Sequence, residues 1–370
     1  MIPPRCTTPA RLFVGIDVMW WCMMAFSIVC KATDDPVVKA PEMRPILCGW
    51  LAKLLGSPAP GYVAAFLDSK GATWRHLETR HLAPELQYKA GRTKRPPEFW
   101  SEVEDFKAIL TLHRIPCLGV EGFEADDIAA TVTRLVLAAE LDVALVTLDH
   151  DWQALTRDRD DLGGEVYCWS YGRREAETIG PAEMLASKNH GLAPRFMPDM
   201  IALCGDGDNI GGVPGIGAEK ARIVLEQYGS IAGILAAPPV DAGALAAEVK
   251  RTMKERDAAM KAIRKADPNI PDPVAAHTTA SLALDAARAA VGAEKYRGMI
   301  ASERAAVELG LVLATLDPFA PLDPPFDLAA CAVGGFDVPA LVALYTRLGF
   351  NLMAGDVAGS STAAPAANAA

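Results

Sequence analysis

Three short apolar runs, each followed by an aspartate, constrain the fold of this chain more than any other feature. The runs are FVGID, VAAFLD and VALVTLD, and they end at Asp17, Asp68 and Asp149. Continuous apolar runs of this length, bounded by polar residues, are typical of strands that are buried on both faces. The sequence therefore predicts buried parallel strands rather than the half-exposed strands of an open antiparallel sheet.

The strands alternate with helical segments along the chain. We expect strands over 12–16, 62–67 and 143–148, and helical periodicity is clear over 98–113 and 128–140. Strands that alternate with helices form parallel sheets covered by helices on both faces. The sequence therefore predicts an α/β fold with a central, mostly parallel sheet.

The three aspartates are expected to meet at one edge of this sheet. In open α/β sheets the functional crevice lies at the carboxyl ends of the strands, and strands of one parallel sheet end at the same edge. A single aspartate after a strand is more often a helix cap or a turn residue. Three such residues, with further acids close by, fit that interpretation poorly.

Two further acidic groups extend the cluster. The segment GFEADD opens a helix, where one or two acids suit the positive end of the helix dipole, but three exceed what a cap needs. A fourth strand-associated acid follows in LDHD, and two more lie in the loop CGDGDNI. The candidate metal ligands are Asp17, Asp68, Glu124, Asp126, Asp127, Asp149, Asp151, Asp206 and Asp208.

This set of oxygen donors predicts a metal centre. Nine carboxylates in one cleft would repel one another strongly unless cations neutralised them. Ligands that contain oxygen alone, without His or Cys, select hard ions such as Mg²⁺ or Mn²⁺. Two such ions can hold a phosphodiester and activate water for its hydrolysis. We therefore expect two divalent cations and phosphodiester hydrolysis.

A glycine-rich loop predicts contact with a DNA backbone. The segment GGVPGIGAEKA runs into a helix expected over 218–228, and its glycines permit close approach of another backbone. Amides at a helix N-terminus bind phosphate, and this pattern is that of a helix–hairpin–helix, which grips DNA without reading bases. The candidate DNA-binding residues here are Gly212, Val213, Gly215, Gly217, Lys220 and Arg222.

Composition excludes several other classes of protein. The net charge of −10 argues against a protein that coats nucleic acid through bulk positive charge. The eight cysteines form no CxxC pair, which predicts reduced thiols and neither a disulfide framework nor a zinc site. The apolar segment 12–30 is nearly long enough for a membrane span or a signal peptide, but it contains Asp17. We expect a soluble, cytoplasmic protein with no membrane partner.

These motifs together resemble the 5′ nuclease family, which includes the 5′-3′ exonuclease domain of bacterial DNA polymerase I, phage 5′ exonucleases and flap endonucleases. The similar segments occur in the family's order over roughly residues 11–353: FVGID, FLDSKGATWRH, YKAGR, GFEADD, TLDHD, GDGDNIGGVPGIGAEKA and LATLDPFAPLD. Three positions depart from the pattern: no Tyr-Arg pair follows Asp17, His150 replaces a lysine, and the GDGDN loop is one residue shorter.

The resemblance implies a PIN-like sheet with flanking helices, a helical arch and a helix-3-turn-helix region. It implies one metal held by Asp17, Asp68, Glu124, Asp126 and Asp127, and a second surrounded by Asp149, Asp151, Asp206 and Asp208. It further implies that Lys89 and Arg92 engage the scissile phosphate as catalytic residues and that Arg75 contacts a substrate phosphate. A basic stretch, 70–95, is consistent with a path for single-stranded DNA on which Tyr88 stacks against a base.

The same motifs predict the domain organisation. We expect a leader over 1–10, a PIN-like catalytic core over 11–190 and a helix–hairpin–helix region over 191–240. A helical part over 241–355 is expected to close the nuclease domain, and the low-complexity end, 356–370, is expected to be disordered.

The function predicted from the sequence is a metal-dependent 5′-3′ exonuclease and flap endonuclease that acts near free 5′ ends of DNA, in the cytoplasm of a bacterium or of a phage host. One alternative is a phage enzyme that removes RNA primers from RNA–DNA hybrids. A second is a catalytically silent, structure-specific DNA-binding protein, which has no use for nine clustered acids. A third is a PIN-like ribonuclease, which normally lacks the VPGIG hairpin. The sequence indicates no protein partner.

Overall fold

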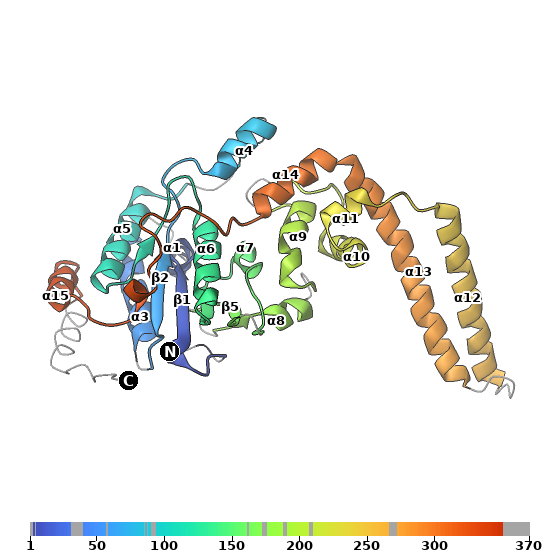
Figure 1. The fold of residues 1–370 in the computed structure, drawn as a ribbon, viewed down its shortest axis with the longest axis horizontal. Helices are drawn as coiled ribbons and strands as arrows, with labels where there is room; N and C mark the ends of the chain where they lie inside the picture. The colour runs from blue at the N-terminus through green and yellow to red at the C-terminus, as the bar shows by residue number, and fades with distance from the viewer. Residues whose placement is uncertain are drawn as a thin grey trace. The chain divides into compact units, whose positions relative to one another are not determined.

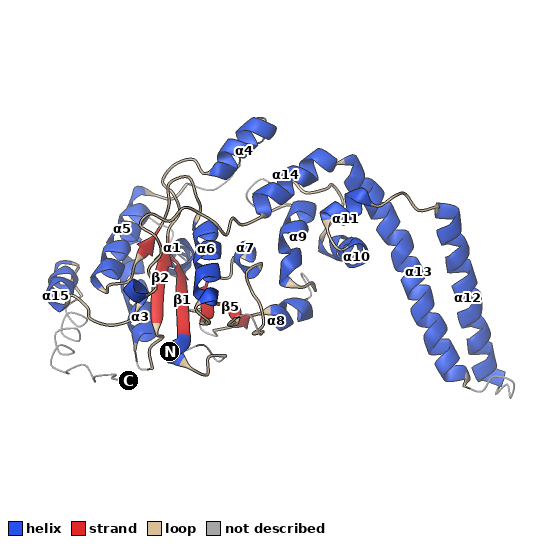
Figure 2. Cartoon of the chain, viewed as in Figure 1, coloured by secondary structure: helices blue, strands red, loops and turns tan. Residues whose placement is uncertain are grey.

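The chain divides into two compact units, each described by itself. The computed structural model describes residues 3, 5–30, 40–56, 58–84, 86, 88–89, 94–160, 163–171, 176–187, 191–206, 210–265 and 272–350 (Figures 1 and 2). The first, the sheet unit, comprises Met1–Glu85, Arg92–Met184 and Leu316–Ala370. The second, the helical unit, comprises Leu86–Gly91 and Leu185–Thr315. The sheet unit is therefore discontinuous in sequence.

A six-stranded sheet forms the centre of the sheet unit, with strand order β3-β2-β1-β4-β5-β6. All neighbouring strands pair in parallel except β5 and β6, which are antiparallel. The strands are β1 (Leu12–Asp17), β2 (Tyr62–Phe66), β3 (Cys117–Leu118), β4 (Asp142–Val146), β5 (Val166–Trp169) and β6 (Thr178–Ile179). Every residue of β1, β4 and β5 is buried, as continuous apolar runs predict.

Side chains alternate across β1 and build two separate cores, one on each face of the sheet. Leu12, Val14 and Ile16 pack on one face with α1 (Val18–Cys30), α3 (Met43–Leu55), α5 (Pro97–Leu112) and α15 (Val338–Arg347). Phe13 packs on the other face with α6 (Ala125–Ala138), α7 (His150–Gln153) and the segment around η4 (Ala329–Cys331). The remaining elements of this unit are η1 (Pro9–Arg11), η2 (Ala40–Glu42), α4 (Trp74–Leu82) and α8 (Pro181–Ala186).

The predicted α/β class and mostly parallel sheet are confirmed. The three predicted strands are β1, β2 and β4, and the two predicted helices are α5 and α6, each within a few residues of the expected bounds. The apolar segment 12–30 forms β1 and the buried helix α1 rather than a membrane span. None of the helices in the described part of the chain is both long and apolar enough to cross a bilayer.

The helical unit has its own core. Its elements are η3 (Pro194–Phe196), α9 (Met197–Cys204), α10 (Ala218–Tyr228), α11 (Ile231–Ala236), α12 (Ala242–Lys265), α13 (Pro273–Ser302) and α14 (Arg304–Ala314). Residues of α9, α10 and α11 pack together with Ile300 and Val307. The long helices α12 and α13 run side by side as a helical hairpin (Figure 1). Helices α12, α13 and α14 lie within the part of the chain, 241–355, that is expected to be helical.

Candidate active site at the carboxyl edge of the sheet

The strand order places a topological switch point between β1 and β4. From β1 the chain moves outward to β2 and β3, and it then returns to β4 on the other side of β1. Ligands of doubly wound sheets bind at such a point, beyond the carboxyl ends of the two strands. Asp17 is the last residue of β1, and Asp149 follows β4 as the N-cap of α7. Two of the predicted ligands therefore lie at the switch point, beyond the carboxyl ends of neighbouring strands.

Thr147 joins these two positions. Its hydroxyl donates a hydrogen bond to Asp17 Oδ2 (3.0 Å) and accepts one from the backbone N–H of Asp149 (3.1 Å). Thr147 is completely buried. The hydroxyl thus fixes the Asp17 carboxylate at the end of β1 relative to the backbone that follows β4.

Asp17 is held in an electrostatically unfavourable position. It is only 6 % exposed, and its Oδ1 accepts a hydrogen bond from Trp20 N–H (2.9 Å). Burial raises the pKa of its carboxyl well above the ordinary range, and the nearby negative charges of Asp126, Asp149 and Asp68 raise it further. Each of these three carboxylates is therefore close enough to repel the carboxylate of Asp17, as the strand pattern predicts.

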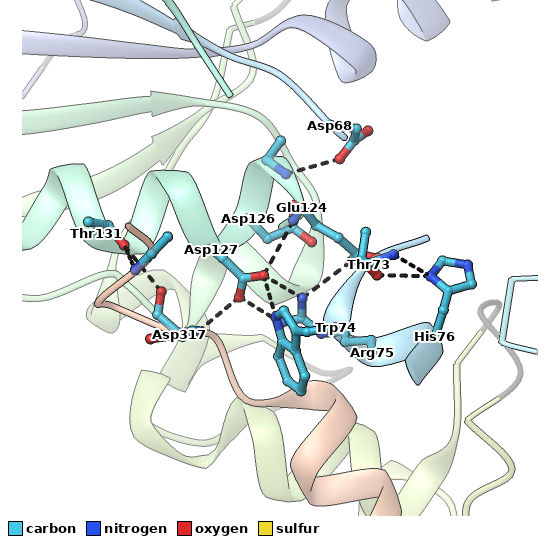
Figure 3. Close-up of polar contacts among 12 residues, drawn as sticks. Asp68, Thr73, Trp74, Arg75, His76, Glu124, Asp126, Asp127, Thr131 and Asp317 are labelled. Carbon is cyan, nitrogen blue, oxygen red and sulfur yellow. Dashed lines mark hydrogen bonds and ion pairs between the residues drawn. The ribbon is translucent and has the colours of Figure 1, made fainter. Parts of the chain in front are cut away.

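The N-terminus of α6 brings in the second acidic group. Asp68, just beyond β2, accepts a hydrogen bond from the backbone N–H of Ala125 (3.0 Å), the first residue of α6 (Figure 3). Asp126 lies in the first turn, and its Oδ1 accepts a hydrogen bond from the indole N–H of Trp152 (2.6 Å). The end of β2 and the start of α6 are thereby fixed at the same edge of the sheet.

Glu124 and Asp127 form a reciprocal cap on α6. The Glu124 side chain accepts from the backbone of Asp127, and Asp127 Oδ2 accepts from Glu124 N–H (3.4 Å). Glu124 also accepts hydrogen bonds from the Thr73 hydroxyl (3.1 Å) and from Arg75 (3.4 Å) (Figure 3). The capping role that acids at a helix N-terminus usually have therefore applies to both residues.

The remaining predicted ligands lie elsewhere. Asp151 lies in α7, two residues after Asp149. Asp206 belongs to the helical unit, where its Oδ1 accepts from Ile210 N–H (3.1 Å) and its own N–H donates to the Ile210 carbonyl (3.1 Å). Asp208 lies outside the described residues. The predicted split of nine acids between two metals thus stays a prediction.

The donor chemistry of the sheet edge fits a hard divalent cation. The side chains are all carboxylates, and the repulsion that raises the pKa of Asp17 is what a bound cation would offset. Within the described part of the chain, no group of three or more His, Cys, Asp or Glu side chains is already arranged to hold an ion. The carboxylates are close neighbours rather than a preformed coordination shell.

Two residues predicted to contact DNA have other surroundings. Arg75 is 1 % exposed, and its guanidinium is bound to Asp127 and Glu124 instead of facing a substrate phosphate. Tyr88 is 8 % exposed, so its ring is not presented for stacking on a base, and Lys89 lies over it at 5.1 Å from the ring centroid. Arg92 lies outside the described residues, as do 90, 91 and 93, so the predicted arch is untested.

The loop between α9 and α10 turns sharply at VPGI. Ile216 N–H donates to the Val213 carbonyl (2.9 Å), and Gly215 has a φ of +80°, so Val213–Ile216 has the pattern of a type II turn with Pro at its second position. Gly217 caps α10, and Lys220 Nζ donates to the Gly215 carbonyl (2.7 Å). Arg222 forms an ion pair with Glu226 (3.0 Å). The loop that connects α9 to α10 thus ends in a tight turn before α10, and DNA binding by this region stays a prediction.

Sequence reasoning missed the residues that hold the carboxylates in place. Thr147, Trp152 and Thr73 donate to Asp17, Asp126 and Glu124. No local pattern marks Trp152 or Thr73, because their contacts with Asp126 and Glu124 join positions far apart in the chain. Thr147 alone carried a signal, since it stands two residues before a strand-end aspartate.

The comparisons with known proteins match this picture. Residues 43–188 match the family model for the 5′-3′ exonuclease N-terminal resolvase-like domain. DNA polymerase I of Mycobacterium tuberculosis is 34 % identical over 186 residues, which are 50 % of this chain and 19 % of that protein. The match therefore spans only about a fifth of the length of this relative.

Solved structures share the fold over nearly the whole chain. The D15 protein of bacteriophage T5, co-crystallised with metal ions, has a TM-score of 0.53 at 18 % identity, covering 94 % of this chain and 98 % of that one. A structure of the same phage flap endonuclease with DNA and metal ions gives a TM-score of 0.52 at 18 % identity and the same coverage. The sheet, the order of the acidic motifs and the family match agree. The family to which residues 43–188 of this chain are similar is thus that of the 5′-3′ exonuclease N-terminal resolvase-like domain.

Proposed function

We propose that the chain is a divalent-metal-dependent 5′ nuclease that hydrolyses DNA phosphodiester bonds near free 5′ ends or at flaps. The observation that carries the proposal is the convergence of four carboxylates at the switch point of the sheet, each on a different element. Asp17 ends β1, and Asp68 and Asp149 follow β2 and β4. Asp126 lies in the first turn of α6. Repulsion between carboxylates destabilises a fold. It is expected in a metal-dependent hydrolase, because the cluster of carboxylates binds the cations.

The metal ligands of the sheet unit would be Asp17, Asp68, Asp126, Asp149 and Asp151. Oxygen donors favour Mg²⁺ or Mn²⁺ over softer ions, and two ions are expected. Bound cations supply charge neutralisation at the scissile phosphate and activation of water for attack. The co-crystallisation of the T5 D15 protein with metal ions supports a divalent cation, and the choice of Mg²⁺ or Mn²⁺ rests on the donor chemistry.

The chain's own residues would fix and orient this centre. Thr147 and Trp152 hold Asp17 and Asp126 in defined orientations through hydrogen bonds of 3.0 and 2.6 Å. Lys89 and Arg92 would stabilise negative charge on the phosphate, as the resemblance implies. Because carboxylates held in place need little rearrangement on binding a cation, the hydrogen bonds lower the cost of assembling the site.

The substrate would be DNA gripped through its backbone. Support comes from the hairpin 213–217 before α10, from Lys220 and Arg222 in that helix, and from the T5 flap endonuclease solved with DNA. Amides at a helix N-terminus bind phosphate without reading sequence. This mode of contact predicts that cleavage depends on the structure of the substrate rather than on its sequence.

Cleavage of 5′-labelled substrates tests the proposal. Flap, nicked, single-stranded and RNA–DNA hybrid substrates are incubated with Mg²⁺ or Mn²⁺, with or without EDTA. The wild type is expected to cut near the 5′ end only with the metal, and strong hybrid preference would favour primer removal. The Asp126→Asn, Asp149→Asn variant is expected to bind DNA but to cut at least about a hundredfold more slowly.

The matched control is Asp285→Asn, the same chemical change at an exposed acid of α13. It should cleave like the wild type. Cleavage that persists in EDTA, or that begins at 3′ ends, would rule the proposal out.

A further inference from the structure

The carboxylate of Asp127 is saturated with protein donors. Arg75 Nη1 donates to its Oδ2 (2.7 Å) and Arg75 Nη2 to its Oδ1 (2.9 Å), a two-pronged pair (Figure 3). The Trp74 indole N–H donates to Oδ2 (3.0 Å) and the backbone N–H of Asp317 to Oδ1 (2.9 Å). The backbone N–H of Glu124 also donates to Oδ2 (3.4 Å). Because two carboxylate oxygens offer about four acceptor sites, these donors occupy all of them. Asp127 is also 0 % exposed.

The guanidinium of Arg75 is equally committed. It lies 4.4 Å from the centroid of the Trp74 ring and also reaches Glu124 Oε2 at 3.4 Å. Arg75 is therefore buried between two carboxylates and offsets their charge. A buried arginine held in this way cannot leave for a substrate phosphate without leaving Asp127 uncompensated.

The same contacts join three segments of the sheet unit. Trp74 and Arg75 open α4, Asp127 lies in the first turn of α6, and Asp317 follows the excursion of the chain through the helical unit. The Thr131 hydroxyl adds hydrogen bonds to the Asp317 carbonyl (3.3 Å) and from Ala320 N–H (2.9 Å). Asp127 thus lies at the centre of a buried polar network that fixes where α6 begins.

Asp126, by contrast, points to a different partner. Its carboxylate accepts from Trp152 of α7, and its negative charge contributes to the raised pKa of Asp17. Adjacent residues of a helix lie on different faces, about 100° apart. One of the two neighbouring aspartates therefore faces the carboxylates of the sheet edge, and the other faces Arg75.

We propose that Asp127 is a positioning residue rather than a metal ligand, and that its pair with Arg75 holds the N-terminus of α6 so that Asp126 faces the metal centre. The role assigned to Asp126 rests on the proposed function. The pairing of Arg75 with Asp127 does not, so the two ideas can fail separately.

A double-mutant cycle on the metal-free protein tests the pairing. Asp127→Asn, Arg75→Met and the double variant are unfolded by urea in EDTA. Each single change leaves a buried charge without its partner, so both single variants should show a lowered urea midpoint. The decrease in the stability of the double variant should be clearly smaller than the sum of the decreases in the two single variants. Additive losses would overturn the pairing.

Binding of Mn²⁺ alone, followed by electron paramagnetic resonance without DNA, tests the metal role. Asp127→Asn is expected to bind Mn²⁺ within about threefold of the wild-type affinity, whereas Asp126→Asn should lose about tenfold or more. Cleavage by Asp127→Asn should show a reduced kcat with an unchanged Mn²⁺ half-saturation. Equal loss of Mn²⁺ affinity in both variants would overturn the proposal, whereas no Mn²⁺ binding by the wild type would overturn the proposed function.

Arg75→Lys is the milder variant should Asp127→Asn not fold. It keeps the positive charge but loses the two-pronged geometry. The variant is expected to lower the urea midpoint and to slow cleavage while Mn²⁺ affinity stays within about threefold of wild type. Wild-type stability and cleavage in Arg75→Lys would show that the geometry of the pair does not position the site.

Discussion

Asp17, a proposed metal ligand, lies where the ionised form of its side chain is unfavourable in the folded protein. Its side chain is buried at the end of β1, where hydrogen bonds from Trp20 and Thr147 favour the ionised form. Burial and the charges of three other aspartates oppose that form. The folded carboxyl therefore holds its proton to a higher pH than the unfolded one does. In this window the folded state binds more protons, so its stability falls as pH rises.

Asp17→Asn is expected to stabilise the metal-free protein at neutral pH while abolishing cleavage. The amide keeps nearly the same shape but removes the repulsion, which should raise the free energy of unfolding by about 1 kcal/mol or more. Urea unfolding in EDTA at pH 7.5 measures the gain. Unfolding at pH 4 is the control, because a protonated Asp17 resembles asparagine and the gain should shrink there. A variant less stable than wild type at pH 7.5 would contradict this account.

The identity of the acids was readable from the sequence, but their partners were not. Asp17, Asp68 and Asp149 stand after apolar runs, so a local pattern places them at one edge. Arg75 was predicted to contact a substrate phosphate because FLDSKGATWRH resembles a segment of the 5′ nuclease family. Its burial depends on Asp127, about fifty residues further along the chain, and no local pattern reports such a contact.

At the scale of elements, the turn before α10 depends on particular glycines. Gly212 has a φ of +62°, and a Cβ there would lie 2.5 Å from the carbonyl carbon of Cys204 and from the backbone nitrogen of Gly205. Backbone atoms at that distance cannot yield as a flexible side chain can. The positions of α9 and α10 relative to each other therefore require glycine at 212.

Gly212→Ala is expected to destabilise the helical unit by about 2 kcal/mol, through steric overlap and the positive φ. The matched control is Gly211→Ala, since a Cβ at 211 meets nothing within 4 Å, and it should change stability by less than about 0.5 kcal/mol. Hydrogen exchange of the amides in α9 and α10 measures both. Equal protection in the two variants would show that the close approach does not constrain the turn.

Another contact between elements depends on pH. His113, just after α5, contacts Tyr345 of α15 through a 3.1 Å hydrogen bond between Nε2 and the hydroxyl. Its Nδ1 is buried and has no hydrogen-bond partner among the described residues. Burial lowers the pKa of His113 from 6.5 to about 4. The unfolded chain takes up this proton first, so stability is lost as pH falls from 6.5 towards 4.

His113→Gln should therefore flatten the acid side of the stability profile. Between pH 7 and 4.5 the wild type is expected to lose about 2 kcal/mol more than the variant, which has no group to titrate there. Urea unfolding at several pH values measures the difference. Tyr345→Phe, which keeps the imidazole, should retain the wild-type slope. If stability depended on pH in the same way in the wild type and in His113→Gln, the loss of stability at low pH could not be attributed to His113.

Long periodic elements were predictable and short ones were not. The helix over 218–228 was predicted with the observed bounds, because GIG marks its start and YG its end. The two-residue strands β3 and β6 carry too few residues to show a period, and they exist because a neighbouring strand supplies hydrogen bonds. Helix α3 was missed because Pro45 and Gly49 interrupt its helical propensity, which burial of Leu47 and Leu51 overrides.

At the scale of the whole molecule, the sheet unit closes with residues from the far end of the chain. Leu341, Leu344 and Tyr345 of α15 belong to the core that covers one face of the sheet, together with Phe106 and Ile109 of α5. The helical unit lies between these segments in the sequence and keeps a separate core. A substitution in the core of one unit should therefore lower the stability of that unit and leave the stability of the other unchanged.

Leu341→Ala and Ile300→Ala test this independence. Both side chains are fully buried, so each change should cost about 2–5 kcal/mol. Hydrogen exchange should accelerate in the sheet for Leu341→Ala and in α9 and α10 for Ile300→Ala. Leu282→Ala, at an exposed position, is the control and should change neither. Acceleration in both units from either core change would show one cooperative body instead of two.

The discontinuity of the sheet unit also sets an order of events during synthesis on the ribosome. The sheet is encoded by residue 184, but the residues of α15 that cover one of its faces emerge about 150 residues later. At translation rates of about 5–20 residues per second, the delay is on the order of ten to thirty seconds. For that time the apolar face of α5 lacks its cover from α15, and residues 185–315 of the helical unit are being synthesised. A newborn chain therefore passes through a period in which that face is exposed before its own C-terminal helix can cover it.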